Sequence, residues 1–281
     1  MYQVVNVDDE KYPSLLKQIK DAPKNIYYKG NFKEDIFSNC LAVVGSRKIS
    51  SYGKWVTQKF VTELVSLGIT IVSGFMYGVD ATAHFAAVKA KGKTIAVMPC
   101  GIDLIHPSIL GHLYQDILNS NGLIISEYEG KFKPCLWTYP RRNRIIAGLC
   151  QAVLVVEAQE RSGSLITARY AKKYNRKTFC IPGQINSVNS KGIINLIKEG
   201  STIVGEVSDI LDFYQIKYSS IASSKMFDSD NLIIKNLMLE PMDFDTLCEK
   251  TGLRNEQLGS ELTMLLLSDK IIEQEGKYYT N

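Results

Sequence analysis

The chain is poor in the residues and runs on which several protein classes depend. It has three histidines, and its six cysteines form no Cys-x-x-Cys pair, so neither a zinc site nor a disulfide framework is predicted. No apolar run approaches the roughly 20 residues that span a bilayer. The first residues, MYQVVNVDDEKYP, lack the basic and apolar parts of a signal peptide. We therefore expect a cytoplasmic protein with reduced thiols, no bound metal and no membrane association.

The common nucleotide-binding and hydrolytic motifs are missing as well. In the turn VVGSRKISSYG the next glycine is Gly53, which breaks the Gly-x-Gly-x-x-Gly spacing of a dinucleotide site. The run AKGKTIAV contains Gly-Lys-Thr, but Ala87 stands where a P-loop needs glycine. No Ser-His-Asp order and no paired carboxylates stand out. We expect a protein that is not an enzyme and binds no cofactor.

Short apolar runs alternate with longer amphipathic stretches along most of the chain. Continuous apolar strands of this kind predict an α/β fold, with a mainly parallel sheet that is flanked by helices on both faces. Ligands of such sheets bind at the carboxyl ends of the strands. The predicted strands are 41–46, 69–74, 93–98, 122–127, 152–158, 177–182 and 201–206.

A serine-rich stretch divides the chain into two predicted domains. We expect a first domain over 1–214, with 1–39 as an N-terminal lead-in, and a linker over 215–228. The remaining residues, 229–281, show three helix-like pieces and a hairpin turning at Gly276, which suggests a small C-terminal winged-helix domain.

Charge is unevenly divided between these regions. Residues 226–281 hold 5 Lys/Arg and 11 Asp/Glu, a net charge of −6. The remaining 28 Lys/Arg and 18 Asp/Glu lie in residues 1–225, which therefore have a net charge of +10. A polyanion should therefore bind the first region. The predicted recognition helix, from Asn255 to Ser268, carries Glu256 and Glu261 but no Lys or Arg. Its charge favours contact with a protein over reading of DNA.

The basic run TYPRRNRIIAGLC and the turn SGSLIT point to an anion site. Backbone N–H groups at helix starts, next to fixed guanidinium groups, bind anions. The first run supplies Arg142, Asn143 and Arg144. The second supplies Ser162, Gly163, Ser164 and Thr167, with Ser164 as the expected N-cap.

Two further turns have the same order of strand end, glycine and helix start. One holds Gly45, Ser46 and Arg47, with Ser50 and Ser51 close behind as further donors, and the other holds Ser73 and Gly74. Beyond the second turn, Asp80 is expected to cap a helix and His84 to be a packing residue rather than a catalyst.

An irregular segment, KFKPCLWTYP, leads into the arginines. It adds the cation Lys133 and two aromatic residues, Trp137 and Tyr139. An aromatic ring here either stacks on an unpaired base or lies buried under the loop, and the sequence leaves both open.

Taken in order, the runs VVGSRKISSYG, IVSGFMYGVDATAH, TIAVMPCGIDLIHP, LIISE, YPRRNRIIAG, VLVVEAQERSGSLITA and FCIPGQ closely resemble the DNA-processing protein A (DprA/Smf) family. The resemblance extends from about Tyr12 to Tyr214, and the acidic tail is similar to that family's winged-helix domain. It implies a Rossmann-like core that forms homodimers, binds and protects single-stranded DNA without sequence specificity, and loads the recombinase RecA on it. These activities belong to natural transformation and DNA recombination.

Together, the residues and the resemblance give the expected DNA-binding set: Gly45, Ser46, Arg47, Ser73, Gly74, Lys133, Trp137, Arg142, Asn143, Arg144, Ser162, Gly163, Ser164 and Thr167. A nucleotide-processing enzyme is the alternative, because the core also resembles that of the lysine-decarboxylase-like phosphoribohydrolases. Those enzymes carry a PGGxGTxxE motif, and the corresponding run here, VEAQERSGSLITA, lacks its paired glycines and its glutamate. DNA reading by the winged helix is a third, weaker possibility.

Overall fold

The computed structural model describes residues 2–217, 231–237, 240–268, 270–274 and 276–280. The chain divides into two compact units, residues 1–218 and 219–281. Of the predicted linker, residues 218–228 lie outside the described residues. Within the described part, none of the helices combines the length and the apolar character needed to cross a bilayer.

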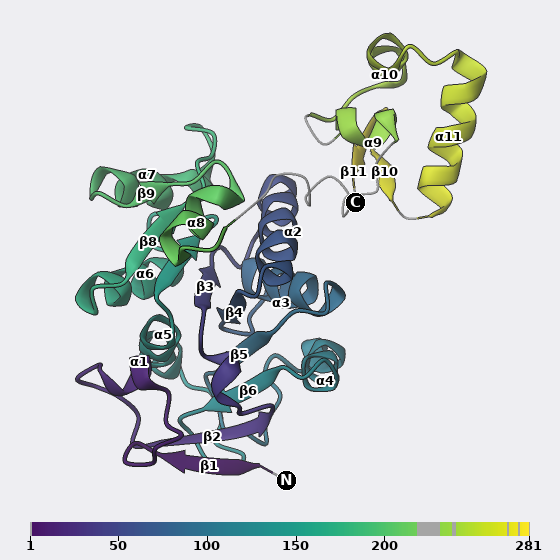
Figure 1. Ribbon diagram of the computed structural model, residues 1–281. Helices are drawn as coiled ribbons and strands as arrows, with labels where there is room; N and C mark the ends of the chain where they lie inside the picture. Colours follow the sequence, from purple (N-terminus) through teal and green to yellow (C-terminus); the bar gives the residue numbers. More distant parts are fainter. Residues whose placement is uncertain (1, 218–230, 238–239, 269, 275, 281) are drawn as a thin grey trace. The chain divides into compact units, whose positions relative to one another are not determined.

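The first unit is built on one sheet (Figure 1). Strand β2 pairs antiparallel with β1 and with β6, and every other pairing in the sheet is parallel, so the predicted mainly parallel sheet is confirmed. In spatial order its strands are β1 (Gln3–Asn6), β2 (Asn25–Gly30), β6 (Leu123–Ser126), β5 (Thr94–Met98), β4 (Thr70–Ser73), β3 (Cys40–Val44), β7 (Ala152–Val155), β8 (Lys177–Cys180) and β9 (Thr202–Ile203).

The two edges of the sheet differ from the sequence prediction. Strands β1 and β2 lie in the segment expected to be only a lead-in. They are partly exposed, and their apolar residues form runs of only two and three. The strand predicted over 201–206 shortens to the two residues of β9, of which Ile203 is exposed at the edge.

Helices cover both faces of the sheet. Side chains of the central strands alternate between two cores, with Ala42 and Val44 in one and Leu41 and Val43 in the other. The first core is closed by α1 (Ser14–Lys17), α5 (Thr138–Leu149), α6 (Ser164–Lys173) and α7 (Lys191–Lys198). The opposite face is covered by α2 (Ser51–Ser66), α3 (Val79–Lys89), α4 (Gly111–Asn119) and α8 (Val207–Tyr214). Short 3-10 helices are η1 (Glu34–Ile36), η2 (Ser108–Leu110) and η3 (Val188–Ser190).

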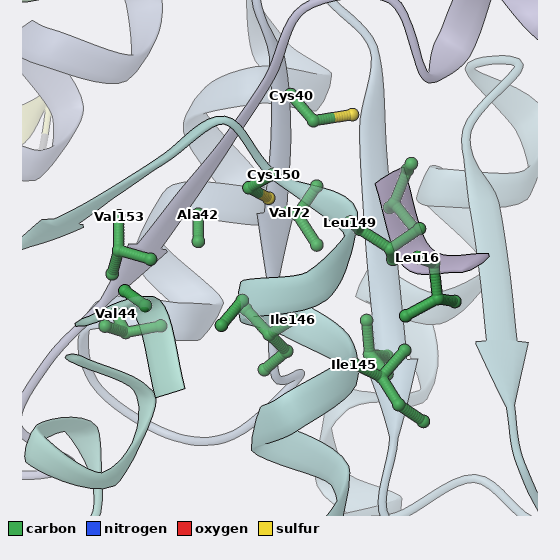
Figure 2. Packing of buried hydrophobic residues seen from close by; sticks show 14 of the residues in the cluster. Leu16, Cys40, Ala42, Val44, Val72, Ile145, Ile146, Leu149, Cys150 and Val153 are labelled. Atoms are coloured by element: carbon green, nitrogen blue, oxygen red, sulfur yellow. The ribbon is translucent and has the colours of Figure 1, made fainter. Parts of the chain in front are cut away.

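Helix α5 carries the basic run and is anchored by its apolar residues. Ile145, Ile146 and Leu149 are buried in the first core, close to Leu16 of α1 and Val72 of β4 (Figure 2). Burial of each such side chain contributes about 1.5–3 kcal/mol, so the axis of the helix is held firmly against the sheet. The arginines in its first two turns therefore have defined directions.

On the other face, His84 of α3 is completely buried, and its Nδ1 lies 2.7 Å from Oγ1 of Thr94. Burial lowers the pKa of His84 to about 3, so the ring is neutral at physiological pH. This confirms the predicted packing role.

The second unit has the element order of a winged-helix module. Its described elements are α9 (Leu232–Leu237), α10 (Phe244–Thr251), α11 (Asn255–Leu267) and the antiparallel hairpin of β10 (Ile271–Gln274) and β11 (Lys277–Thr280). Leucines of α10 and α11 meet Ile233 and Ile271 in a separate core. Gly276 turns the hairpin with φ +75°, which glycine adopts without strain. Helix α11 corresponds to the predicted recognition helix.

Candidate functional site

A pocket of about 410 Å³ opens at the carboxyl ends of β3 and β7. In the sheet order, β3 lies between β4 and β7, so the chain leaves these neighbouring strands in opposite directions. Doubly wound folds bind ligands at such a switch point. The walls are the loop after β3, the loop after β7 and the first turns of α5.

The pocket brings together nine of the fourteen residues predicted from the sequence. They are Gly45, Ser46, Arg47, Arg142, Asn143, Ser162, Gly163, Ser164 and Thr167. Ser73 and Gly74 lie behind the pocket wall, because the Ser73 hydroxyl donates to the Val43 carbonyl (2.6 Å) and the Gly74 carbonyl accepts a hydrogen bond from Arg142. The other three, Lys133, Trp137 and Arg144, do not line it.

Arg47 and Lys48 are exposed cations of the pocket, and Tyr139 is an aromatic residue of its wall. The Arg47 guanidinium carbon lies 5.2 Å from the centroid of the Tyr139 ring, within the range of a cation–π contact. The Tyr139 hydroxyl is in turn 2.7 Å from Nε2 of His106, which fixes the orientation of the ring. Of the two aromatic residues that the sequence left open, Tyr139 thus lines the pocket.

Arg142 contributes a buried positive charge to the pocket, but its N–H groups are engaged by the protein itself. It is 4% exposed, and its guanidinium donates to the carbonyls of Gly74 and Val97. Burial lowers its pKa to about 10, so it remains protonated at neutral pH. A Cβ on Gly74 would lie 2.5 Å from the Asp80 carboxylate and 2.6 Å from Arg142 Nη2, so only glycine leaves room for these two groups.

The role expected for Asp80, capping α3, is wrong. Gly78 is the N-cap, and the Asp80 carboxylate faces Ser73 and Arg142 below the pocket. Burial raises the pKa of Asp80 to about 6, although Arg142 opposes the shift. Asp80 is therefore a pocket residue that the sequence reasoning missed.

The N-cap residue of α2, Ser50, is bound by a carboxylate of the chain itself. Glu157, just after β7, accepts from the backbone N–H of Ser50 (3.0 Å) and from its hydroxyl, and also from Nδ2 of Asn189 (3.1 Å). Gly53 is required here, because a Cβ would lie 2.6 Å from the Glu157 carboxyl carbon. The expectation that Ser50 offers a donor to an external anion is therefore not met. Its partner stands 107 residues away in the sequence.

The loop after β7 is joined to α5 by Asn143. The Asn143 amide donates to the Gly163 carbonyl (3.1 Å) and accepts from Nε of Arg142 (3.2 Å). The hydroxyls of Ser162 and Ser164 lie 2.7 Å apart. Helix α6 begins at Ser164 with Gly163 as N-cap and without a side-chain cap, so the predicted N-cap is wrong by one residue.

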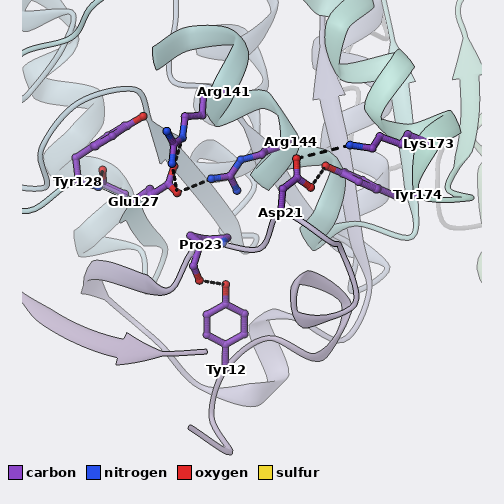
Figure 3. Close-up of polar contacts among 10 residues, drawn as sticks. Tyr12, Asp21, Pro23, Glu127, Tyr128, Arg141, Arg144, Lys173 and Tyr174 are labelled. Atoms are coloured by element: carbon purple, nitrogen blue, oxygen red, sulfur yellow. Dashed lines mark hydrogen bonds and ion pairs between the residues drawn. The ribbon is translucent and has the colours of Figure 1, made fainter. Parts of the chain in front are cut away.

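Arg144 points away from this pocket. Two residues along a helix correspond to a rotation of about 200°, so Arg142 and Arg144 leave α5 on opposite sides. Arg144 pairs with Glu127, which also accepts from Nε of Arg141 at 3.2 Å (Figure 3). The expectation of one pocket for both arginines is wrong for this geometric reason.

Lys133 and Trp137 belong to the segment that precedes α5. Lys133 is exposed, and Trp137 is 50% exposed, with Arg141 5.8 Å from its ring centroid. Trp137 packs edge-on to Tyr128 and Phe132, which stack on each other at 4.7 Å. These rings form an aromatic surface beside the first turn of α5.

Known proteins match this arrangement over most of the chain. Residues 3–215 match the family model of DNA recombination-mediator protein A. The protein Smf of Escherichia coli strain K12 is 35% identical, over 99% of this chain and 77% of its own length. The structure of DNA processing protein A (DprA) from Streptococcus pneumoniae has a TM-score of 0.71 and 39% identity, covering 78% of this chain and 75% of that one.

A second solved structure is DNA processing protein A from Helicobacter pylori, described for its single-stranded DNA binding mode. It has a TM-score of 0.69 and 30% identity, over 78% of this chain and 98% of that one. The resemblance seen in the sequence motifs is confirmed. The chain belongs to the DNA recombination-mediator protein A family.

Proposed function

We propose that the pocket between β3 and β7 binds single-stranded DNA without sequence specificity and protects it. The observation that carries the proposal is the exposed Arg47 guanidinium held against the Tyr139 ring at a cationic pocket. Arg47 and Lys48 are placed to neutralise phosphates, and Tyr139 offers a face on which an unpaired base stacks. Every base has such a face, and phosphates carry no base information, so binding of this kind is sequence-tolerant. The single-stranded DNA binding described for the Helicobacter pylori protein supports the proposal.

The bound strand is then passed to a recombinase. We propose that this cytoplasmic chain loads RecA on single-stranded DNA during natural transformation and recombination, and that it acts as a homodimer. Membership of the recombination-mediator family supports the first part. Residues 1–214 act as the DNA-binding domain, and the acidic second domain, over 229–281 with a net charge of −6 in residues 226–281, contacts a protein rather than DNA.

The chemistry of the pocket supports binding without catalysis. Glu157 is engaged by Ser50 and Asn189, and Asp80 is buried facing Arg142. Glu157 is therefore not free to take a proton from an attacking water, as a nucleotide-hydrolysing enzyme would require. Release of base from nucleoside monophosphates by the purified protein would contradict this view.

Fluorescence anisotropy with labelled single-stranded and duplex oligonucleotides, across a salt series, tests the proposal. We expect tight, salt-sensitive binding of single strands and weak binding of duplex. Arg47→Ala should bind weakly while it unfolds at the wild-type temperature. The slope of log affinity against log salt, about −0.7 per neutralised phosphate, counts the contacts.

Lys89→Ala is the matched control, because it removes an exposed cation at the far end of α3. Equal binding by wild type, Arg47→Ala and Lys89→Ala would show that the pocket is not the DNA site.

A further inference from the structure

A second cavity, of about 800 Å³, lies on the other side of α5. It is bounded by α5, by the residues after β6, by α6 and by the segment that leads into β2. Its volume is in the range of sites that hold a small organic ligand. The lining residues that matter here are Lys24, Tyr27, Glu127, Arg141, Arg144 and Tyr170.

Arg144 brings an unused donor to this cavity. The residue is 4% exposed, and its Nη2 is paired with Glu127. Its Nη1 is buried and has no hydrogen-bond partner among the described residues. Buried guanidinium nitrogens nearly always have an acceptor, so this one is a donor left over beside the cavity, which a ligand reaches once the side chain shifts. Figure 3 shows the guanidinium directed into the space between Glu127 and Asp21.

The charges around Arg144 favour an anion. The lining holds three cations, Lys24, Arg141 and Arg144, and two carboxylates, Asp21 and Glu127, which leaves a net charge of +1. Lys173 pairs with Asp21 from outside the lining. Both carboxylates are already engaged. Asp21 accepts from the Tyr174 hydroxyl (2.6 Å) and pairs with Lys173 (3.8 Å), and Glu127 is held by the two arginines. Lys24 is exposed at the cavity, and no ion pair of its side chain occurs among the described residues.

Aromatic rings complete the lining. Tyr27, Tyr128 and Tyr170 contribute to the wall, and Tyr170 is stacked on Tyr174 with 5.7 Å between ring centroids. Anion donors beside aromatic faces, in a cavity of this size, match a phosphate that carries a planar base. The ligand class is therefore a nucleotide.

Pro140 connects this cavity with the pocket between β3 and β7, because it lines both. The wall between the two is thus the first turn of α5. We infer that the cavity around Arg144 is a second nucleotide site, which takes a further nucleotide of the same single strand as the strand crosses this turn. The inference rests on the proposed function. A free nucleotide has the same chemistry, and the experiment separates the two sources.

The test uses the whole chain with Lys24→Ala, and with Lys20→Ala as an exposed control outside the cavity. Arg144→Ala is avoided because it would leave part of the buried Glu127 pair unmatched. Affinity is measured for a length series of oligo-dT. We expect Lys24→Ala to bind the shortest strands as wild type does, to bind long strands several-fold more weakly, and to reduce the salt slope by about 0.7.

Photocrosslinking locates the strand independently of affinity. Oligo-dT with 4-thiothymidine at successive positions is irradiated with wild type, and crosslinked peptides are identified by mass spectrometry. Crosslinks to Tyr27 or Tyr170 support the inference, whereas crosslinks confined to the Tyr139 pocket, with unchanged binding by Lys24→Ala at every length, overturn it.

Calorimetry with dTMP distinguishes the sources. Binding of dTMP that Lys24→Ala abolishes and Arg47→Ala leaves intact, without crosslinks from oligo-dT in the cavity, would assign the site to free nucleotides and overturn the strand path. If wild type bound no oligonucleotide of any length, the proposed function itself would fail. The strand path would fail with it, and the dTMP titration would show only whether the cavity binds a free nucleotide.

Discussion

The Arg47 guanidinium and the Tyr139 ring lie 5.2 Å apart, centre to centre, although one follows β3 and the other belongs to α5. One offers a permanent positive charge to a phosphate, and the other offers a flat apolar face to a base. Because the guanidinium lies over one face of the ring, a base would stack on the other face while its phosphate meets Arg47.

Replacing Tyr139 should separate stacking from charge. Tyr139→Phe keeps the ring and loses only the hydrogen bond to His106, so we expect single-strand affinity within about twofold of wild type. Tyr139→Ala removes the face, and loss of one stacked base costs about 1–3 kcal/mol. Anisotropy titrations at fixed salt measure both. Equal affinities for Ala and Phe would show that no base stacks on this residue.

Asp80 should make stability depend on pH in a defined direction. Its pKa is raised from 3.8 to about 6 in the fold, so the unfolded chain loses this proton first as pH rises. The free energy of unfolding should therefore fall between about pH 4 and pH 6 by up to about 3 kcal/mol from this group, and should not fall further above that window.

Asp80→Asn isolates the effect from the other titrating groups. The stability of wild type minus that of the variant, from chemical denaturation at several pH values, should be more favourable at pH 4 than at pH 7. A difference that stays constant, or that rises with pH, contradicts the raised pKa.

Gly78 should tolerate no side chain. A Cβ there would lie 2.2 Å from the Ser46 carbonyl oxygen and 2.7 Å from that of Arg47, and φ is +74°. We expect Gly78→Ala to lower the free energy of unfolding by about 2–4 kcal/mol, from overpacking and backbone strain together. Because it pushes on the loop that carries Arg47, it should weaken single-strand binding as well.

Gly205→Ala is the control for this change, since a Cβ at Gly205 meets no atom within 4 Å. In thermal unfolding, the midpoint temperature of Gly205→Ala should be close to that of wild type. If the two alanine variants melted together, the close approach of the two loops would be refuted.

Removal of residues 219–281 should leave DNA binding in place. Residues 1–218 form a compact unit that contains the whole pocket, and the deleted part includes the acidic region with a net charge of −6. We expect the affinity for single strands to stay within about twofold or to rise, because a repelling charge is lost. A large loss in anisotropy titrations would make the winged-helix-like part a DNA reader after all.

The strands that are buried on both faces could be predicted from the sequence. Strands β3, β5 and β7 are covered on both faces, so they appear as unbroken apolar runs. Strands β1 and β2 could not be found in this way, because each is partly open to solvent and has at most three apolar residues in a row.

The position of the pocket was predictable from its turns, but the contacts between its side chains were not. Glycine and serine after apolar runs indicated the pocket, because parallel strands present their carboxyl ends at one edge. The divergence of Arg142 and Arg144 depends on the phase of α5, and the phase is fixed by Ile145, Ile146 and Leu149 in the core. No local pattern connects Glu157 with Ser50, since only the folded sheet brings β7 beside β3.

That carboxylate has a consequence for selectivity against common metabolites. In dinucleotide-binding proteins of this architecture, the helix that follows the first parallel strand directs its N–H groups at a pyrophosphate. Here Glu157 accepts from the backbone N–H and the hydroxyl of Ser50 at the start of that helix, so a pyrophosphate would meet a negative charge there. The chain thus has the strand order of a coenzyme-binding fold, with a carboxylate of its own at the helix start where such folds hold a phosphate.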